Sequence, residues 1–209
     1  MKRCDGAEYG RIVILNGAPR AGKSSIAMEI QDTFDGVWIN LGVDGYKAMI
    51  PKRFQPGIGL RPGGEGPDLE PVVVSLYTAL YESVAVHSRM GIHVVADVGH
   101  HDSYSTPLKI LPRCASILRD LPVLFVGVRC PIGEIMRRRE NTSYLSYRED
   151  GTIPAPILLW QDAVHSPGIY DMEVDTSTDT PREIAKAIRE RLDRAHFSAF
   201  RRLADQYGS

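Results

Sequence analysis

A glycine-rich segment near the start of the chain leaves few folds open to it. Residues 17–24 read Gly-Ala-Pro-Arg-Ala-Gly-Lys-Ser, which fits the pattern G-x-x-x-x-G-K-[ST] at every fixed position. An apolar run precedes the segment at 11–16, and a helical stretch follows it from about residue 23 to 34. A strand, a turn and a helix in this order are the context in which the pattern forms a phosphate-binding loop.

The fixed residues of this loop have the properties that phosphate binding needs. Gly17 and Gly22 let the backbone turn its amides inward, and the helix that follows offers unpaired amides and a favourable dipole. We expect Lys23 to neutralise the β- and γ-phosphates and Ser24 to bind Mg²⁺. The sequence therefore predicts ATP and Mg²⁺ as cofactors, unless the segment is a strand–helix turn with a chance Lys-Ser pair. The expected nucleotide-binding residues are Gly17, Ala18, Pro19, Arg20, Ala21, Gly22, Lys23, Ser24 and Ser25.

The rest of the chain alternates between apolar runs and helical patterns. Further strands are expected at 37–43, 93–98 and 123–130, with a weaker one at 172–175. The runs are continuously apolar, as in strands that are buried on both faces. Helices are expected at 70–89, at 131–139, and from a capping box at Thr180 and Glu183 to about residue 204. This alternation predicts an α/β fold of the P-loop NTPase type, with a five-stranded parallel sheet and helices on both faces.

Length and composition are those of an ordinary soluble protein. The 209 residues suit a single domain covering 1–209, without internal repeats. Hydrophobic residues make up 43% and the formal net charge is −1, so the bulk charge favours neither nucleic acid nor an anionic membrane as a partner. Three widely spaced cysteines form no disulfide framework, and neither a signal peptide nor a membrane-spanning stretch is visible. We therefore expect a cytoplasmic protein.

Two segments match neither a strand nor a helix. Residues 51–67 hold four prolines and five glycines without a hydrophobic period, and a loop of this length is usually functional or mobile. Residues 141–154 are polar and are expected to form a flexible flap. We interpret residues 51–68 as an acceptor loop, because they lie where the specificity for a second substrate should be set.

Two carboxylates are expected near the phosphates. Asp97 ends an apolar run at 93–97, which is the position of a Walker-B-type metal ligand, although it could instead cap the next turn. The predicted metal ligands are therefore Ser24 and Asp97. Asp44 follows the second predicted strand, where it could accept the proton of a substrate hydroxyl or cap a short helix. Its position alone favours neither role.

Several short motifs carry a family resemblance. They are I-L-N-G at 14–17, A-G-K-S at 21–24, G-V-D at 42–44 with Ala48-Met49 and Pro51 downstream, V-G-V-R-C at 126–130, Arg139-Glu140, and V-H-x-x-G-x-Y-D-x-E-V-D-T at 164–176. With these motifs the chain resembles the chloramphenicol phosphotransferase-like P-loop kinases over most of its length. The resemblance implies a nucleoside-monophosphate-kinase-like fold and transfer of the ATP γ-phosphate to a hydroxyl, with Asp44 as the general base.

Three regions depart from the family pattern. The acceptor loop at 51–68 is unusually rich in glycine and proline, and a polar stretch at 141–150 stands where the family continues with further arginines. The C-terminal tail from about residue 191 to 209 is longer than the family pattern needs. The substrate of the family's prototype, an antibiotic, therefore does not carry over directly to this chain.

Three consecutive arginines, at 137–139, end the helix predicted at 131–139. Successive helical residues point about 100° apart, so not all three can face one ligand. The resemblance favours Arg139, which would neutralise the transferring phosphoryl group, and the alternative is a solvated helix end. The catalytic candidates are therefore Asp44, Lys23 and Arg139.

Other side chains carry less specific signals. His100, His101 and Asp102 lack metal-ligand spacing and are expected to line the acceptor pocket or to lie in an exposed loop. Tyr46, Met49 and Phe54 could form an apolar acceptor wall, but we prefer packing around a short helix. Packing residues are also expected at Trp38 and Trp160.

The leading hypothesis is an ATP-dependent phosphotransferase that acts on a hydroxyl of a small molecule, with an antibiotic such as chloramphenicol as one version. The alternative is a nucleotide or metabolite kinase of the same fold. A nucleotide-binding regulatory module is a third hypothesis, but it leaves Asp44 unexplained, and no N-K-x-D guanine-reading motif is visible. The sequence does not predict an oligomeric state.

Overall fold

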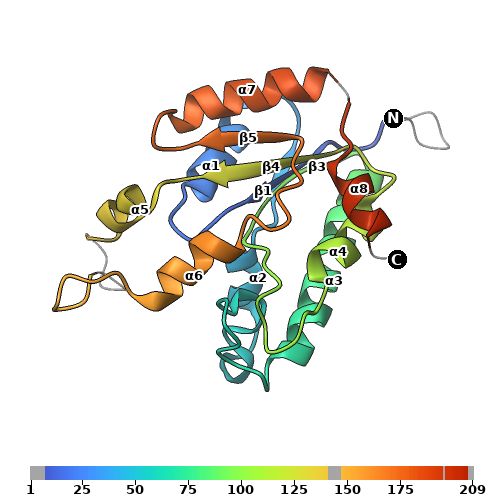
Figure 1. The fold of residues 1–209 in the computed structure, drawn as a ribbon. Coiled ribbons are helices and arrows are strands. Elements are labelled where there is room, and N and C mark those ends of the chain that lie inside the picture. Colours follow the sequence, from blue (N-terminus) through green and yellow to red (C-terminus); the bar gives the residue numbers. More distant parts are fainter. Residues whose placement is uncertain (1–7, 141–146, 195, 207–209) are drawn as a thin grey trace.

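The fold is built on a parallel sheet, as the alternation of strands and helices predicts. The computed structural model describes residues 8–140, 147–194 and 196–206. Within them, β1 (Ile12–Asn16), β2 (Trp38–Asn40), β3 (His93–Val98), β4 (Val123–Arg129) and β5 (Met172–Asp175) form a sheet in the order β2-β3-β1-β4-β5 (Figure 1). Each neighbouring pair is parallel, so the carboxyl ends of all these strands meet at one edge.

Helices cover both faces of this sheet, and β1 shows the division. Ile12 and Ile14 face one core, while Val13 and Leu15 face the other. The first core is covered by α3 (Glu70–Arg89), α4 (Ile110–Leu118) and α8 (Ala199–Asp205), and the second by α1 (Lys23–Thr33), α5 (Ile132–Arg139), α6 (Ala155–Ala163) and α7 (Pro181–Asp193). Figure 1 shows α7 and α3 on opposite sides of the strands. The predicted five-stranded α/β fold is confirmed.

The second strand is shorter than predicted. It ends at Asn40 instead of residue 43, because only Trp38, Ile39 and Asn40 pair with β3. Gly42 then forms the N-cap of α2 (Val43–Met49). Asp44 therefore lies in the first turn of a helix, just beyond the edge of the sheet.

The helix predicted at 180–204 is wrong in one respect, because two helices occupy this region. α7 begins at the predicted capping box, in which Thr180 and Glu183 exchange hydrogen bonds, and it ends at Asp193. The apolar side chains of α7 belong to one core, whereas Phe200 of α8 belongs to the other. The chain has to leave the helical path to reach the opposite face of the sheet.

Helices α4 and α6 were not predicted, and both carry a proline near their start. Pro112 is the third residue of α4, and Pro156 is the second residue of α6. First-turn amides have no intrahelical acceptor, so proline removes no helical hydrogen bond there. Residues 51–68 form a loop, as predicted, and it contains two short 3₁₀ turns, η1 (Lys52–Phe54) and η2 (Gly57–Gly59).

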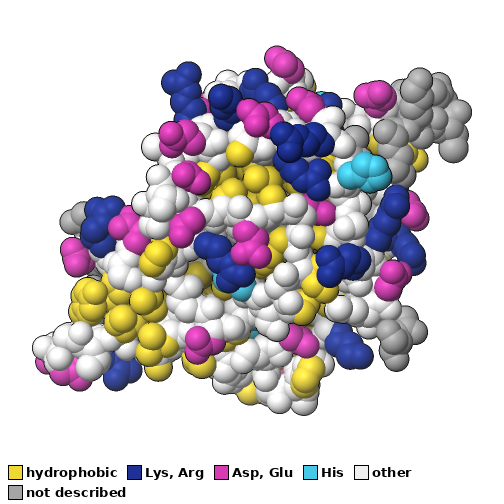
Figure 2. Space-filling model, turned by 45° about the horizontal axis from the view of Figure 1, so that its top comes forward, with side chains coloured by type: hydrophobic (Ala, Val, Ile, Leu, Met, Phe, Trp, Pro, Cys, Tyr) yellow, Lys and Arg dark blue, Asp and Glu magenta, His cyan; other side chains and the backbone are white. Residues whose placement is uncertain are grey.

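The surface carries charges of both signs. Figure 2 shows Lys, Arg, Asp and Glu side chains interspersed over the face that it presents. In residues 8–140, 147–194 and 196–206, no helix combines the length and apolarity that crossing a bilayer requires.

Candidate active site

A cavity of about 710 Å³ opens at the carboxyl edge of the sheet. Its walls come from the loop after β1, the start of α2, the end of β3, the acceptor loop, the segment after β5, and helices α3, α5 and α6. A single cavity therefore joins the predicted phosphate loop to the predicted acceptor loop, although these segments lie far apart in the sequence.

The phosphate loop has the backbone geometry that its glycines predict. Gly22 has φ 91°, in the left-handed region that favours glycine, and no side chain of the described residues caps the helix that it begins. A Cβ on Gly17 would lie 2.5 Å from the carbonyl oxygen of Val128. The amides of the first turn of α1 thus remain available to an anion, which fits the phosphate tail of a nucleotide.

Most of the predicted nucleotide-binding residues line the cavity. They are Gly17, Pro19, Arg20, Gly22, Lys23, Ser24 and Ser25. Ala18 and Ala21 are instead buried in the core beneath α1, so only their backbone could contact a nucleotide.

Lys23 curls back over the loop that carries it. Its ammonium donates hydrogen bonds to the carbonyl oxygens of Gly17 and Ala18, at 2.8 and 2.9 Å. Burial lowers the pKa of Lys23 to about 8, and the negative charges of Asp97 and Asp44 oppose this shift. Both carboxylates are therefore close enough to act electrostatically on the lysine that is predicted to hold the phosphates.

Ser24 and Asp97 meet as a Walker-type metal site requires. The Ser24 hydroxyl donates to a carboxylate oxygen of Asp97 at 2.7 Å. Hydroxyl and carboxylate oxygens are ligands that Mg²⁺ accepts, and this metal usually takes its other ligands from phosphates and water. The donor set therefore fits a magnesium ion that is shared with a nucleotide.

The carboxylate of Asp97 also touches the start of α2. A Cβ built on Gly42 would lie 1.7 Å from its other carboxylate oxygen, so only glycine fits at this position without displacing Asp97. Asp44, two residues later, lines the same cavity from the first turn of α2. The structure brings Asp44, Lys23 and Asp97 to one cavity, although the roles of these residues stay predictions.

The three consecutive arginines have different surroundings. Arg137 and Arg138 both pair with Glu134, but Arg137 is exposed, whereas Arg138 and Arg139 line the cavity. Arg138 donates to the carbonyl oxygens of Arg20 and Thr176, and therefore ties α5 to the phosphate loop and to the end of β5.

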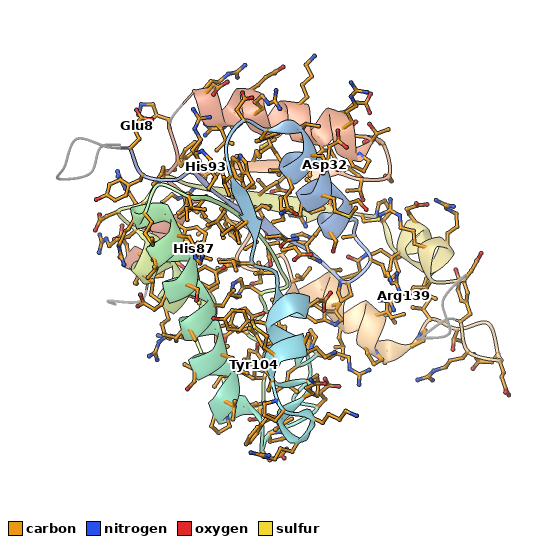
Figure 3. The ribbon with its side chains drawn as sticks, turned by 180° about the vertical axis from the view of Figure 1, so that it is seen from behind. Glu8, Asp32, His87, His93, Tyr104 and Arg139 are labelled. Carbon is orange, nitrogen blue, oxygen red and sulfur yellow. The ribbon has the colours of Figure 1, made fainter. Side chains whose placement is uncertain are left out.

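Arg139 is only 4% exposed, and its guanidinium lies 3.5 Å from the carbonyl oxygen of Pro19. Figure 3 shows it between α5 and α6. A cation at this position is suited to a phosphoryl group. Of the predicted flap, residues 141–146 lie outside the described residues.

The acceptor half of the cavity has apolar walls with a charged rim. Ile58, Tyr77 and Trp160 line it, and the Trp160 ring lies so close to Gly99 that a Cβ there would be 3.1 Å away. Trp160 is a packing residue, as predicted, but it is also part of this wall. Lys47 and Arg61 contribute cations to the same half. No local sequence pattern marks Tyr77, Lys47 or Arg61, so these three residues were not predicted.

The prediction for His100 and His101 is wrong. They are 1% and 4% exposed, so they are not exposed loop residues, and neither is among the described residues that line the cavity. His100 bonds Tyr81 through its ring and Asn16 through its backbone amide, at 2.7 Å each. Burial lowers the pKa of His100 to about 3, so the ring stays neutral. His100 thus links α3 to the end of β1, and the His101 ring bonds the carbonyl oxygen of Leu60 in the acceptor loop.

The apolar wall considered for α2 does not form. Tyr46 packs against the core, and its hydroxyl lies 3.1 Å from that of Ser83, whereas Met49 is 72% exposed. Neither residue, nor Phe54, is among the described residues that line the cavity. The packing interpretation holds for Tyr46, and Met49 points into solvent.

Comparisons with known proteins agree with this fold. A curated relative from Mycobacterium tuberculosis (strain ATCC 25618 / H37Rv), which carries the provisional name O-phosphotransferase Rv2636, is 24% identical over 97% of this chain and 91% of its own length. The M. tuberculosis APS kinase CysC, solved in complex with AMPPNP and APS, superposes with a TM-score of 0.60 at 16% identity, covering 89% of this chain and 99% of the kinase.

Shikimate kinase from Acinetobacter baumannii, solved in complex with shikimate, gives a TM-score of 0.55 at 12% identity and covers 88% of this chain and 93% of that protein. These likenesses show a common P-loop kinase fold. The family model described as chloramphenicol phosphotransferase-like protein matches residues 10–193. The chain therefore belongs to the chloramphenicol phosphotransferase-like family of P-loop phosphotransferases.

Proposed function

We propose that this protein transfers the γ-phosphate of ATP to a hydroxyl of a small molecule, with Asp44 as the general base. One observation carries the proposal, namely that Asp44 lines the same cavity as Lys23 and Asp97 of the phosphate half and the apolar residues of the acceptor half. The carboxylate is thus available to an acceptor whose hydroxyl reaches the phosphates from the opposite side.

The residues divide the reaction between them. The amides at the start of α1 and the Lys23 ammonium bind the phosphates, and Arg139 neutralises charge on the transferring γ-phosphoryl group. Asp44 accepts the proton of the acceptor hydroxyl while the oxygen of that hydroxyl bonds to the γ-phosphorus. The bond from the γ-phosphorus to the bridging β–γ oxygen breaks at the same time, and ADP leaves. Ser24 and Asp97 would hold Mg²⁺, which supplies charge neutralisation across the phosphates.

Substitution of Asp44 tests this proposal. Asp44→Asn should lower kcat by about 10²–10⁴-fold, because a base is lost, while nucleotide affinity stays within about twofold. Transfer is measured as the gain of one phosphoryl group by mass spectrometry over a set of hydroxylated antibiotics, including chloramphenicol, and hydroxylated metabolites. Near-normal turnover of Asp44→Asn with an accepted alcohol would remove Asp44 from the role of base.

The same assay separates the remaining alternatives. An antibiotic kinase and a metabolite kinase differ in which alcohols gain phosphate, and both consume ATP mainly when the acceptor is present. A regulatory module would hydrolyse ATP slowly at a rate that no alcohol changes. A cytoplasmic location and a single domain also remain predictions from the sequence.

A further inference from the structure

We propose that Lys47 forms an anion-binding subsite in the acceptor half of the cavity, so that the acceptor is a small organic anion carrying a hydroxyl. This inference rests on the proposed function and adds the chemical class of its second substrate. It starts from the position of one side chain on α2.

Lys47 and the proposed base lie on the same helix. Lys47 follows Asp44 by three residues, so the two side chains leave neighbouring positions on one side of α2, and both line the cavity. The stem of Lys47 is half-buried beside the acceptor loop, where a Cβ on Gly59 would lie 3.8 Å from its Cδ. The Gln55 side chain donates to the backbone carbonyl of Lys47 at 2.9 Å and fixes the end of the helix. Lys47 therefore lines the cavity from the same helix as the proposed base.

The charge of Lys47 is not compensated within the described part of the chain. Among those residues, no carboxylate forms an ion pair with it. Arg61, the other cation of the acceptor half, pairs with Glu65 through its side chain and also donates to it through its backbone amide. The cations of the phosphate half, Lys23 and Arg139, face the phosphate loop. Lys47 thus supplies positive charge that no carboxylate of the described residues holds in an ion pair.

The walls around this charge decide what can fill the space. Ile58, Tyr77 and Trp160 are buried and mainly apolar, so a bound acceptor would displace water from the cavity and from Lys47. A cation that loses water without gaining a partner costs free energy. A carboxylate or phosphate on the acceptor removes this cost, whereas a neutral alcohol such as chloramphenicol leaves it in full. The cavity therefore selects a hydroxylated anion.

The test uses pairs of acceptors that differ in charge alone. Hydroxy acids from glycerate to shikimate are each compared with their methyl esters, sugar monophosphates are compared with the free sugars, and chloramphenicol serves as the neutral antibiotic. The full-length protein, Lys47→Met, Lys47→Arg and Lys52→Met are assayed for phosphoryl gain at saturating Mg-ATP. Lys52 is a matched control, because it is an exposed lysine of the same loop region that does not line the cavity.

The wild type should prefer the anion of the accepted pair. Lys47→Met should lower kcat/KM for that anion by about 10–100-fold, mainly through KM, and should leave the neutral partner within about twofold. Lys47→Arg should restore most of the preference and Lys52→Met should not change it. The carboxylate and phosphate arms identify which anion the subsite takes.

Three results would overturn the inference. If only neutral alcohols gain phosphate, the anion subsite is wrong and the proposed function stands. If Lys47→Met lowers the anion and its neutral partner equally, Lys47 is structural. If no alcohol of either class is phosphorylated, the proposed function fails and the subsite fails with it.

Discussion

The two halves of the cavity are built in different ways. The phosphate half comes largely from nine consecutive residues, 17–25, and its binding groups are mainly backbone amides at the start of α1. The acceptor half is assembled from α2, the acceptor loop, α3 and α6, and its surface consists of side chains such as Tyr77 and Trp160. A backbone site tolerates few sequences, whereas a side-chain site can change its ligand by single substitutions. The contrast predicts that substitutions in the phosphate half impair the reaction with every acceptor, whereas the residues of the acceptor half determine which acceptor this chain takes.

Removing the charge of the phosphate half should have the largest effect. Lys23→Ala deletes the ammonium that crosses the loop, so we expect kcat/KM for ATP to fall by about 10²–10³-fold with any acceptor. Steady-state kinetics with two acceptors of different size checks this prediction. A loss that depends on the acceptor would show that Lys23 acts on the acceptor and not on the phosphates. Lys186→Ala, at an exposed position of α7, is the control.

A methyl group at the boundary between the halves should come next. Gly42→Ala places its Cβ 1.7 Å from the Asp97 carboxylate, so either this side chain or α2 must move. Because a displacement of about 1 Å can cost 10²-fold in rate, we expect kcat to fall by about that factor. Gly45→Ala is the matched control, since no atom lies within 4 Å of its added Cβ. Equal activity of the two variants would mean that Asp97 can shift without consequence.

The link between α5 and the phosphate loop should have a smaller effect. Arg138→Lys keeps the charge but loses the planar set of donors that reaches Arg20 and Thr176, and we expect nucleotide affinity to fall about 10-fold. Arg137→Lys, which changes an exposed arginine of the same helix, should bind nucleotide normally. Calorimetric titration with a non-hydrolysable ATP analogue compares them, and indistinguishable affinities would argue against the link.

The smallest effect should come from a residue that packs beside the acceptor half without entering it. Tyr46→Phe removes one hydroxyl contact with Ser83, so the free energy of unfolding should fall by about 1 kcal/mol while KM for the acceptor is unchanged. Chemical denaturation and acceptor kinetics measure the two quantities. An altered KM would mean that Tyr46 contacts the acceptor, although it is not among the described residues that line the cavity.

The same contrast explains what could be predicted from the sequence. The phosphate loop, the strand pattern and the strand-end Asp97 are local features, because a motif or an apolar run is complete within a few residues. Only tertiary packing brings Lys47, Tyr77 and Trp160 to the cavity wall, and their spacing in the sequence does not predict this position. Asp44 lies between these cases. Its place after a strand and a short helix next to it were both considered from the sequence, but its position inside the first turn, with Gly42 as the N-cap, was not.

The errors in secondary structure have a similar origin. The length of β2 depends on how many of its residues find a partner in β3, and the break after α7 depends on which face of the sheet each segment covers. Neither quantity is encoded in hydrophobic periodicity alone. The missed helices α4 and α6 are different, because a proline in a first turn is a signal that could have been used.

Helix α8 has a consequence for any shortened version of the protein. The family match ends at residue 193, yet Phe200 lies beyond it, with its ring centroid 6.2 Å from that of Tyr81 and 5.1 Å from that of Phe125. Tyr81 in turn bonds His100, whose backbone amide donates to Asn16 at the foot of the phosphate loop. A chain that ended at residue 193 would lack Phe200 and its packing against Tyr81. It would therefore lose the outermost member of a series of contacts that runs through Tyr81 and His100 to Asn16, next to the phosphate loop.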